Sequence, residues 1–333
     1  MNILVTGGLG FIGSNFILYL IQNYPEIKII NIDAEVLGSN KKNLSHLKNK
    51  NYKYFKGNIT DKKLLKKLIP RVDSVINFAA ESHVDRSISN SEPFLKSNIL
   101  GVYSILDTIR KNSKKTKFLQ ISTDEVFGSK SSGSAQEGDT FHPSNPYSAS
   151  KASAELIIES YVKTYDLDIM ITRCTNNFGP QQFPEKLIPK TLIRSINNLK
   201  IPIYGTGKNI RDWLYVEDHC DAISKVLLNG KSGESYNISG NNLFSNIQLV
   251  KKILKNLDKN DELIDYVIDR PGHDLRYSLD SSKIRHKLGW KPKQKFDKSL
   301  SETVNWYLEN KAWWKNLATK QMLSPTPWKK YRK

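Results

Sequence analysis

The first half of the chain alternates short apolar runs with longer amphipathic segments. The apolar runs have the length and the content of β-branched and aromatic residues typical of buried strands: ILVT, KIINID, YKYFKG, DSVINFAA, KFLQIST and DIMITRC. Between them, apolar residues recur at helical spacing, as in FIGSNFILYLIQN, LLKKLI and SNILGVYSILDTIRKN. This alternation predicts an α/β fold, a doubly wound parallel sheet with crossover helices on both faces.

Beyond about residue 175 the alternation loosens. Loops that contain Pro and Gly, such as FGPQQFP, IPIYGTGKN and DRPGHD, interrupt short strands and helices. We therefore expect two domains. Residues 1–175 form the main sheet, with some later segments packing on it, and residues 176–333 mainly form a smaller α/β domain interleaved with the first.

Composition narrows the class of protein. The chain has 333 residues, 38% of them apolar and 25% charged, which is ordinary for a globular protein. No apolar run approaches the ~18 residues that span a bilayer, and the start, MNILVTGGLGF, lacks the pattern of a signal peptide. Two cysteines, Cys174 and Cys220, provide neither a disulfide framework nor a metal cluster, so we expect no metal and a cytoplasmic location.

The net charge of +18 invites a nucleic-acid or membrane partner. The lysines, however, are spread along the chain, as in KKNLSHLKNKNYKYFKG and DKKLLKK, rather than gathered in one segment. We expect a solvated basic surface and neither of those partners. A positive field would still help to gather a substrate that carries a diphosphate.

Three glycines, Gly7, Gly10 and Gly13, follow the first expected strand and open the first expected helix. Glycines there allow a tight turn and let the backbone approach a pyrophosphate, which the helix N-terminus then binds. Asp33 ends the second strand, 20 residues after Gly13, where a carboxylate binds a ribose 2′-hydroxyl and repels a 2′-phosphate. The complete strand–turn–helix context favours a Rossmann-type site for NAD over a plain run of turn glycines.

Tyr147 and Lys151 lie four residues apart in PYSASK, so they share one face of a helix. A tyrosine with a pKa near ~10 is a poor base at neutral pH, and a nearby ammonium group favours the phenolate. Beside a Rossmann start and a strand that ends in Ser122-Thr123, the pair is typical of short-chain dehydrogenases/reductases. Tyr147 would remove a hydroxyl proton as hydride leaves the same carbon for NAD, and Thr123 would bond the same oxygen.

Two adjacent acids, Asp124 and Glu125, follow Thr123 at the end of a buried strand. Acids at such a position are often a cap and a solvent-facing side chain. A dehydrogenase or a 4-epimerase needs only Tyr, Lys and a hydroxyl. The additional acids therefore indicate additional proton transfers, one acid being protonated and the other ionised.

The chain closely resembles the dTDP-glucose 4,6-dehydratases, nucleotide-sugar enzymes of the extended short-chain dehydrogenase/reductase class. The resemblance covers nearly the whole chain and rests on VTGGLGFIGS, NFAAESHVDRSI, STDEVFG, PYSASKASAE, RCTNNFGPQQFPEKLIP, GKNIRDWLYVEDH, RPGHDLRY and LGWKPK. The first and fourth motifs are shared with the wider class, whereas STDEV, AAESHVDRSI, PEKLIP and RPGHD are more diagnostic. Related enzymes that make UDP-xylose by decarboxylation carry Ser at the position of Asp124, which makes Asp124 the discriminating residue.

The resemblance implies a reaction. Tyr147 takes the proton of the sugar 4-hydroxyl while hydride passes from C4 to NAD. Glu125 then takes the C5 proton and Asp124 protonates the departing 6-hydroxyl. Hydride returns to C6, giving a 4-keto-6-deoxy sugar nucleotide that can supply dTDP-rhamnose or another deoxysugar. Adjacent acids suit this elimination because C5 and C6 are neighbouring atoms.

The resemblance also assigns binding residues, with residues 1–175 holding NAD and residues 176–333 mainly holding the nucleotide sugar. NAD would be contacted by Gly7, Gly10, Phe11, Ile12, Gly13, Asp33, Ala34, Glu35, Val36, Asn58, Ile59, Ala79, Ala80, Ser82, Ser97, Tyr147, Lys151 and Asn177. The nucleotide-diphosphate hexose would be contacted by Ser82, Thr123, Asn176, Lys186, Leu187, Pro202, Ile203, Tyr204, Arg211, Asn246, Asp269, Arg270 and His273. The family further implies a homodimer that pairs the helix around residues 92–111 with the Tyr147–Lys151 helix.

The chain departs from the family pattern in places. Asn58 replaces the usual Asp, which weakens a bond to the adenine amino group. Phe127 and Phe178 stand where Tyr is common, and AEVLGSN replaces KLTYAGN after the second strand. Arg211 suits a phosphate, although it could instead pair with its neighbour Asp212.

Three alternatives stay open at this point. A UDP-linked sugar differs from the dTDP-linked one by a single methyl group, worth about 1–3 kcal/mol in a pocket. An epimerase or decarboxylase of the same class would give Asp124 no role. A Rossmann-fold binding protein would show no turnover and would bind nucleic acid in a salt-sensitive way.

Overall fold

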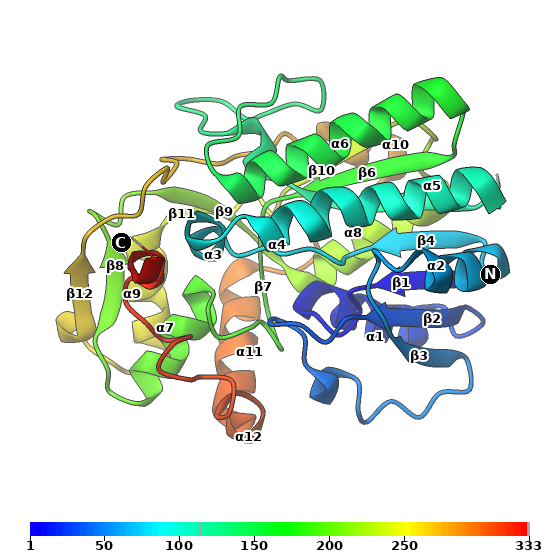
Figure 1. The fold of residues 1–333 in the computed structure, drawn as a ribbon. Helices are drawn as coiled ribbons and strands as arrows, with labels where there is room; N and C mark the ends of the chain where they lie inside the picture. The colour runs from blue at the N-terminus through cyan, green and yellow to red at the C-terminus, as the bar shows by residue number, and fades with distance from the viewer. Residues whose placement is uncertain (113–114, 332–333) are drawn as a thin grey trace.

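A parallel sheet forms the larger part of the molecule in this computed structural model, which describes residues 1–112 and 115–331 (Figure 1). Within these residues the sheet has seven strands in the order β3-β2-β1-β4-β5-β6-β10. Their bounds are β1 Asn2–Thr6, β2 Lys28–Asp33, β3 Tyr52–Lys56, β4 Ser74–Asn77, β5 Lys117–Thr123, β6 Ile169–Cys174 and β10 Ser235–Ile238. Residues 113–114 and 332–333 of the two expected domains lie outside the described residues.

All neighbouring strands of this sheet run parallel. The strand order reverses between β1 and β4, because the chain first winds outward to β3 and then returns to the other side of β1. In open α/β sheets such a switch point creates a crevice at the carboxyl ends of the strands, where ligands bind. The carboxyl ends of β1, β4 and β5 therefore define the place of the site.

Two apolar layers hold helices on the two faces of the sheet. Successive side chains of a strand point to opposite faces, so Ile3 and Val5 join one core cluster and Leu4 joins the other. Helices α1 (Phe11–Asn23), α8 (Val216–Asn229) and α10 (Ser282–Leu288) pack on the first face, and α2 (Lys62–Leu68), α5 (Val102–Asn112) and α6 (Pro146–Tyr165) pack on the second.

The second half of the chain builds a smaller group of sheets and helices beside the large sheet (Figure 1). One sheet has the order β11-β9-β7 and another pairs β12 with β8. The bounds are β7 Asn176–Phe178, β8 Ile201–Tyr204, β9 Ile210–Tyr215, β11 Leu243–Ser245, β12 Ile264–Val267, α7 Leu187–Ile196, α9 Asn246–Asn256, α11 Phe296–Glu309 and α12 Lys311–Trp314. Their core includes the buried Trp313 and Trp314.

Short helical segments connect these parts. They are η1 Lys41–Asn43, η2 Ile69–Arg71, α3 Val84–Ser89, α4 Glu92–Phe94, η3 Leu95–Gly101, η4 Asp124–Phe127, η5 Asp261–Leu263 and η6 Pro327–Tyr331. The π-helical segment η3 joins α4 to α5, so the helix expected around residues 92–111 is present in three consecutive pieces. Segment η6 packs against α3, between the two parts of the molecule.

The expected fold class is confirmed: the six strands expected in the first half are β1 to β6, in a doubly wound parallel sheet. One strand of that sheet, β10, comes from the second half of the chain, and so does α8, which covers one face. The boundary between residues 175 and 176 stays a prediction.

No helix among the described residues is long and apolar enough to cross a membrane. In the same part of the chain, no group of three or more His, Cys, Asp or Glu side chains is arranged to hold a metal ion.

Candidate active site

A cleft of about 760 Å³ opens at the carboxyl ends of β1, β4 and β5. All five residues expected to be catalytic line it, namely Thr123, Asp124, Glu125, Tyr147 and Lys151. The expected cofactor residues that line it are Gly7, Gly10, Phe11, Ile12, Gly13, Asp33, Ala34, Val36, Asn58, Ile59, Ala79, Ala80, Ser82, Ser97, Tyr147, Lys151 and Asn177. One cleft thus brings together residues from segments more than 160 positions apart.

Two positions in the turn after β1 require glycine, because a side chain there would collide with the neighbouring backbone. Gly7 has φ +68°, and a Cβ placed on it would lie 2.6 Å from the backbone nitrogen of Ala79. A Cβ on Gly13 would lie 2.5 Å from the Gly7 carbonyl oxygen. Helix α1 begins just after Gly10 with no side-chain cap, which leaves its first N–H groups free to face an anion. This cradle fits the pyrophosphate of a dinucleotide.

Asp33 lies at the end of β2, buried and turned toward the glycine turn. One carboxylate oxygen accepts the Leu9 N–H at 2.9 Å, and the other accepts the Glu35 N–H at 2.8 Å and the Ser39 hydroxyl at 2.7 Å. A carboxylate offers about four acceptor positions, so one remains for a ribose hydroxyl.

Glu35 is the expected cofactor residue that does not line the cleft. It has φ 57°, and its carboxylate pairs with Lys41 at 2.8 Å and Lys56 at 3.2 Å and accepts the Tyr54 hydroxyl at 2.6 Å. These contacts hold the Glu35 side chain against neighbouring cations. Its contact with a cofactor stays a prediction.

The two acids stand on η4, the tight turn that follows β5. Thr123 caps this turn: its hydroxyl accepts the Glu125 N–H at 3.3 Å and donates to Asp124 Oδ1 at 3.1 Å. The remaining oxygens, Asp124 Oδ2 and Glu125 Oε2, are buried and have no hydrogen-bond partner among the described residues. Buried polar atoms are nearly always bonded, so this pair of bare oxygens marks a site prepared for a ligand.

The surroundings of Asp124 favour the protonated form of its carboxyl group. Burial raises the pKa of its carboxyl group well above the usual range, and the nearby charge of Glu125 raises it further, while the Thr123 hydrogen bond and Arg211 act in the opposite direction. A carboxyl group with a raised pKa stays protonated at higher pH and can act as a general acid. The direction for Asp124 agrees with the expectation that one of the two acids is protonated, and the division of roles between the two acids stays a prediction.

Tyr147 and Lys151 lie one turn apart at the start of α6, where Asn145 and Ser148 form a capping box. The Lys151 ammonium donates to the Ile121 carbonyl oxygen at 2.7 Å. Burial lowers the pKa of Lys151 to about 8. The side chain is therefore anchored to β5, the strand that carries the acids.

The expected lowering of the Tyr147 pKa by Lys151 is not found in the protein chain. Burial raises the pKa of this phenol well above its ordinary value, the charge of Glu125 raises it further, and a hydrogen bond with Thr123 only partly offsets them. The prediction was wrong because it weighed the ammonium group and left out burial and the adjacent carboxylate.

The expected substrate residues fall into two groups. Ser82, Thr123, Asn176 and Lys186 line the cleft, and the Lys186 ammonium donates to the Ser82 carbonyl oxygen at 2.8 Å. The structure places the other expected substrate residues outside the cleft lining, in the second part of the molecule: Leu187, Pro202, Ile203, Tyr204, Arg211, Asn246, Asp269, Arg270 and His273. Their contacts with a substrate stay predictions.

Arg211 does not pair with its neighbour Asp212, so that alternative is wrong. Its guanidinium lies 4.2 Å from the centre of the Tyr277 ring and donates to the carbonyl oxygens of Ile210 and Asp274. The carboxylate of Asp212 instead accepts bonds from Ser239 and from the Asn242 N–H. Side chains of successive strand residues point to opposite faces, which separates the two charges.

Positive charge gathers near Arg211 in the second part of the molecule. Burial and the charges of Arg270 and Arg211 together lower the pKa of His273 to about 4, although Asp269 acts in the opposite direction. His273 also contacts Asp269, with 2.6 Å between Nδ1 and Oδ1. Two guanidinium groups close enough to act on the same imidazole provide the electrostatic setting for a diphosphate.

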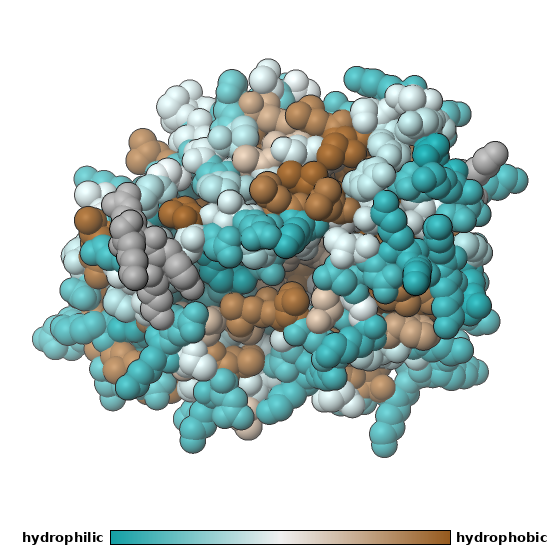
Figure 2. Space-filling view, in the orientation of Figure 1, coloured by the Kyte–Doolittle hydropathy of each residue, from teal (hydrophilic) through white to brown (hydrophobic). Residues whose placement is uncertain are grey.

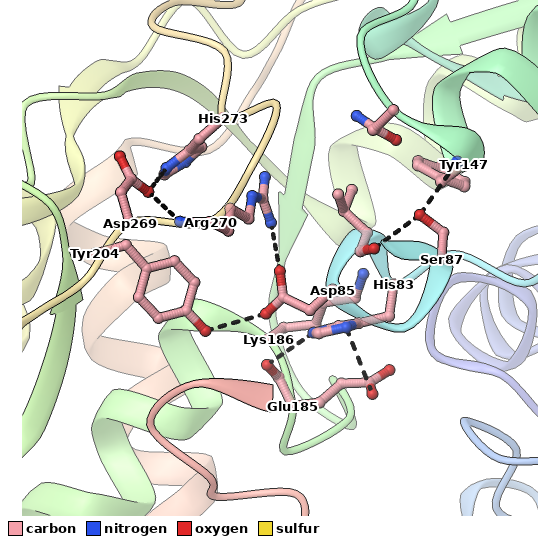
Figure 3. A network of polar contacts seen from close by, with 12 residues as sticks. His83, Asp85, Ser87, Tyr147, Glu185, Lys186, Tyr204, Asp269, Arg270 and His273 are labelled. Carbon is pink, nitrogen blue, oxygen red and sulfur yellow. Dashed lines mark hydrogen bonds and ion pairs between the residues drawn. The ribbon is translucent and has the colours of Figure 1, made fainter. Parts of the chain in front are cut away.

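Sequence reasoning missed an ion-pair network between the cleft and the second part of the molecule. Arg86 donates to Glu81 at 2.8 Å and to Glu185 at 3.1 Å, and all three line the cleft. His83 Nε2 is buried and lies 3.3 Å from the Glu185 carbonyl oxygen; Figure 3 shows the two residues facing each other. The signal was present, because the diagnostic motifs AAESHVDRSI and PEKLIP contain these charges.

The departures from the family pattern have local explanations. Phe127 and Phe178 are almost fully buried in apolar clusters, where a ring hydroxyl would need its own partner. The Asn58 side-chain oxygen accepts bonds from the N–H and the hydroxyl of Thr60, each at 2.9 Å, and so shapes the turn after β3.

The parallel sheet, the glycine turn and the Thr, Tyr and Lys set around one cleft define an extended short-chain dehydrogenase/reductase. The chain belongs to the GDP-mannose 4,6 dehydratase family, whose sequence model matches residues 4–303.

Individual relatives are similar over nearly their whole length. The low-salt glycan biosynthesis protein Agl12 of Haloferax volcanii is 45% identical over 309 residues, which cover 92% of this chain and 99% of that protein. The dTDP-glucose 4,6-dehydratase of Bacillus anthracis, solved with NAD, is 45% identical with a TM-score of 0.90, covering 95% of this chain and 99% of that one. The dTDP-glucose 4,6-dehydratase DesIV of Streptomyces venezuelae, also solved with NAD, is 41% identical with a TM-score of 0.93 over 95% and 100%.

Proposed function

We propose that this protein is an NAD-dependent dTDP-glucose 4,6-dehydratase, a hydro-lyase that forms dTDP-4-keto-6-deoxy-glucose and water. The observation that carries the proposal is a pair of buried oxygens, one on Asp124 and one on Glu125, that have no hydrogen-bond partner in the part of the chain that the structure describes and that share the cleft with Tyr147 and Lys151. A dehydrogenase or an epimerase has no use for two bare acids. Relatives named dTDP-glucose 4,6-dehydratase, 40–45% identical over nearly the whole chain, support the same choice.

The residues that would hold NAD fit it. The glycine turn leaves room only for backbone beside the pyrophosphate, and Asp33 lies where a ribose hydroxyl needs an acceptor. The chemistry supplied by bound NAD is hydride acceptance from C4, hydride return to C6, and a positive ring charge that favours the Tyr147 phenolate.

Tyr147 begins the reaction by taking the proton of the sugar 4-hydroxyl. Its ring is held by Phe94 at 6.3 Å between ring centres, and its backbone N–H donates to the Ser87 hydroxyl at 3.3 Å. Thr123 hydrogen-bonds the same sugar oxygen and thereby lines C4 up with the base. Lys151 lies one helical turn from the tyrosine on α6, where its ammonium is anchored to the Ile121 carbonyl oxygen of β5.

The two acids then carry out the elimination. With a ketone at C4, the C5 proton becomes acidic, and Glu125 removes it as base. Asp124 donates its proton to the 6-hydroxyl, the C6–O bond breaks, and water leaves. A proton returns to C5 as the sugar is reduced at C6. The raised pKa of Asp124 matches its role as the acid, because the group must enter this step protonated.

The nucleotide end would lie across the second part of the molecule. Lys186 at the cleft and Arg211 and Arg270 beyond it supply cations for the diphosphate. Tyr204 offers a ring for the pyrimidine. The product would serve a route to a deoxysugar such as rhamnose.

A homodimer in the cytoplasm completes the proposal. Apolar side chains are exposed along η3, α5 and α6, including Leu100, Tyr103 and Leu156, and Figure 2 shows apolar surface over these helices. A second copy would cover such a surface. Both cysteines are free and buried, as expected in a reducing compartment.

The test is product analysis by mass spectrometry after incubation with dTDP-glucose and, separately, UDP-glucose, with no added reductant. We expect dTDP-glucose to lose one water without net reduction of NAD, and UDP-glucose to react more slowly. Faster turnover of UDP-glucose would reassign the nucleotide. A C4-inverted sugar or released CO₂ would instead identify an epimerase or a decarboxylase.

A further inference from the structure

A buried carboxylate, Asp85 on the short helix α3, joins the two parts of the molecule (Figure 3). It is 2% exposed. Its Oδ1 pairs with Arg270 Nη1 at 2.9 Å, and its Oδ2 accepts the Tyr204 hydroxyl at 3.0 Å. Both partners come from the second part of the molecule, and both are residues to which the proposed function gives the nucleotide.

Asp85 is charged at neutral pH. Burial by itself would raise its pKa, but the charges of His83 and Arg270 and the Arg270 hydrogen bond bring it to about 2. Burial lowers the pKa of His83 to about 4, so at neutral pH Arg270 is the cation that pairs directly with Asp85, and Lys190 adds positive charge nearby. A buried pair of this kind fixes geometry more than it adds stability.

Arg270 keeps most of its donors for another partner. A guanidinium has five N–H groups, and the bond to Asp85 uses one edge through Nη1. The buried Nε has no hydrogen-bond partner among the described residues. Asp85 therefore holds one edge of the fork and leaves another able to bind phosphate oxygens at the same time.

Tyr204 is fixed on three sides. Asp85 bonds its hydroxyl, the Trp328 ring lies 4.5 Å from its ring centre in an edge-on arrangement, and the His273 ring lies 6.2 Å away. A ring held in this way loses little conformational entropy when a base packs against it.

We propose that Asp85 is a positioning residue for the nucleotide diphosphate: it holds the Arg270 guanidinium and the Tyr204 ring in the orientation that binds the diphosphate and the base. This inference rests on the proposed function. A competing role exists on chemical grounds, in which Asp85 occupies Arg270 until the diphosphate displaces it. The free edge of Arg270 favours positioning, and the two roles predict opposite signs.

The first experiment measures the dissociation constant of dTDP by titration calorimetry on the full-length protein and on D85N. Loss of a charged hydrogen-bond partner is expected to weaken dTDP binding about tenfold. The matched control is D221N, because Asp221 is also buried, accepts a tyrosine hydroxyl from Tyr19 at 2.9 Å and pairs with Lys293 at 3.1 Å. Its dTDP affinity should equal that of the wild type. Unchanged or tighter binding by D85N overturns the proposal.

A second experiment separates positioning from general damage. With dTDP-glucose, D85N should raise KM by more than it lowers kcat. In combination with R270Q it should add little to the loss of dTDP affinity caused by R270Q itself, because Asp85 acts through Arg270. Fully additive losses would contradict the inference. Should D85N fail to fold, Y204F still tests the hydroxyl contact, and unchanged dTDP affinity in Y204F overturns it.

These outcomes are distinct from failure of the proposed function. Binding of dTDP needs no turnover, so a wild-type protein that binds dTDP but releases no water would refute the dehydratase and leave the role of Asp85 testable. A wild-type protein with no affinity for dTDP would overturn both.

Discussion

Glu155 contacts the end of β5, and the pair Asp124 and Glu125 directly follows that strand; the two sites differ in how their carboxylate oxygens are bonded. Glu155 on α6 is fully buried and accepts bonds from the Ser122 hydroxyl and from Arg173, at 2.8 Å to Nε and 2.7 Å to Nη2. One residue beyond Ser122 the chain turns through Thr123 into Asp124 and Glu125, each of which keeps one buried oxygen that no other described residue bonds.

The difference distinguishes a carboxylate that stabilises the fold from carboxylates that are available to a ligand. A buried carboxylate that holds the fold has its oxygens bonded, since an unbonded polar group costs about 1–3 kcal/mol. The acids of η4 bear that cost in the folded chain, and under the proposed function a substrate that brings hydroxyl groups and an acidic C–H would remove it. Strain of this kind gathers at functional sites, where the remaining fold stabilises it.

The largest expected effect is on the bare acid. D124N keeps the size of the side chain but removes the proton donor, so we expect water loss from dTDP-glucose to slow by ~10²–10⁴-fold. Oxidation at C4 does not use this acid, and bound NAD should be retained. Single-turnover mass spectrometry, with NAD content measured in parallel, checks both. Dehydration at the wild-type rate in D124N would show that Asp124 takes no part in the mechanism. It would also remove the contrast between Asp124 and Glu155.

Substitution of Glu155, the acid that pairs with Arg173, should instead reduce the stability of the fold. E155Q leaves the Arg173 guanidinium buried without its counter-charge, which should lower the free energy of unfolding by about 3–5 kcal/mol. Urea titration of E155Q and D124N side by side measures this. A loss in D124N as large as that in E155Q would show that both acids support the fold.

The smallest effect is a pH-dependent gain of stability in D124N. Burial raises the folded-state pKa of Asp124 above its unfolded value, so its favourable contribution is complete below the unfolded pKa near ~4 and is lost as pH rises through the folded value. Asn has no such dependence. D124N should therefore match the wild type near pH 4 and exceed it by about 1 kcal/mol at neutral pH. An advantage that shrinks with rising pH would contradict the raised pKa.

The first part of the fold, and the residues that it brings to the cleft, could be predicted from sequence because their signals are local. Each signal lies within a few residues of a strand or helix boundary: the glycines of the first turn, Asp33 at the end of β2, and the Tyr147–Lys151 pair. Parallel strands then bring their carboxyl ends to one edge without any further information.

The substrate side was harder because its contacts come from distant segments. Three residues that contact one another come from separate elements: Tyr204 from β8, Arg270 from a loop and Asp85 from α3. The sequence around each of them gives no signal of these contacts. The raised pKa of Tyr147 was missed for a similar reason. Burial and the charge of Glu125 act through space, and only the folded chain shows how completely the phenol is enclosed.

The most direct test of the central claim follows one hydrogen atom. The protein is incubated with dTDP-glucose that carries deuterium at C4, and the product is examined by NMR. Our account predicts that the deuterium moves to C6, with a solvent proton at C5 and one water lost. Deuterium that stays at C4, or that is absent from C6, would contradict the internal hydride transfer, and with it the role assigned to the acid pair.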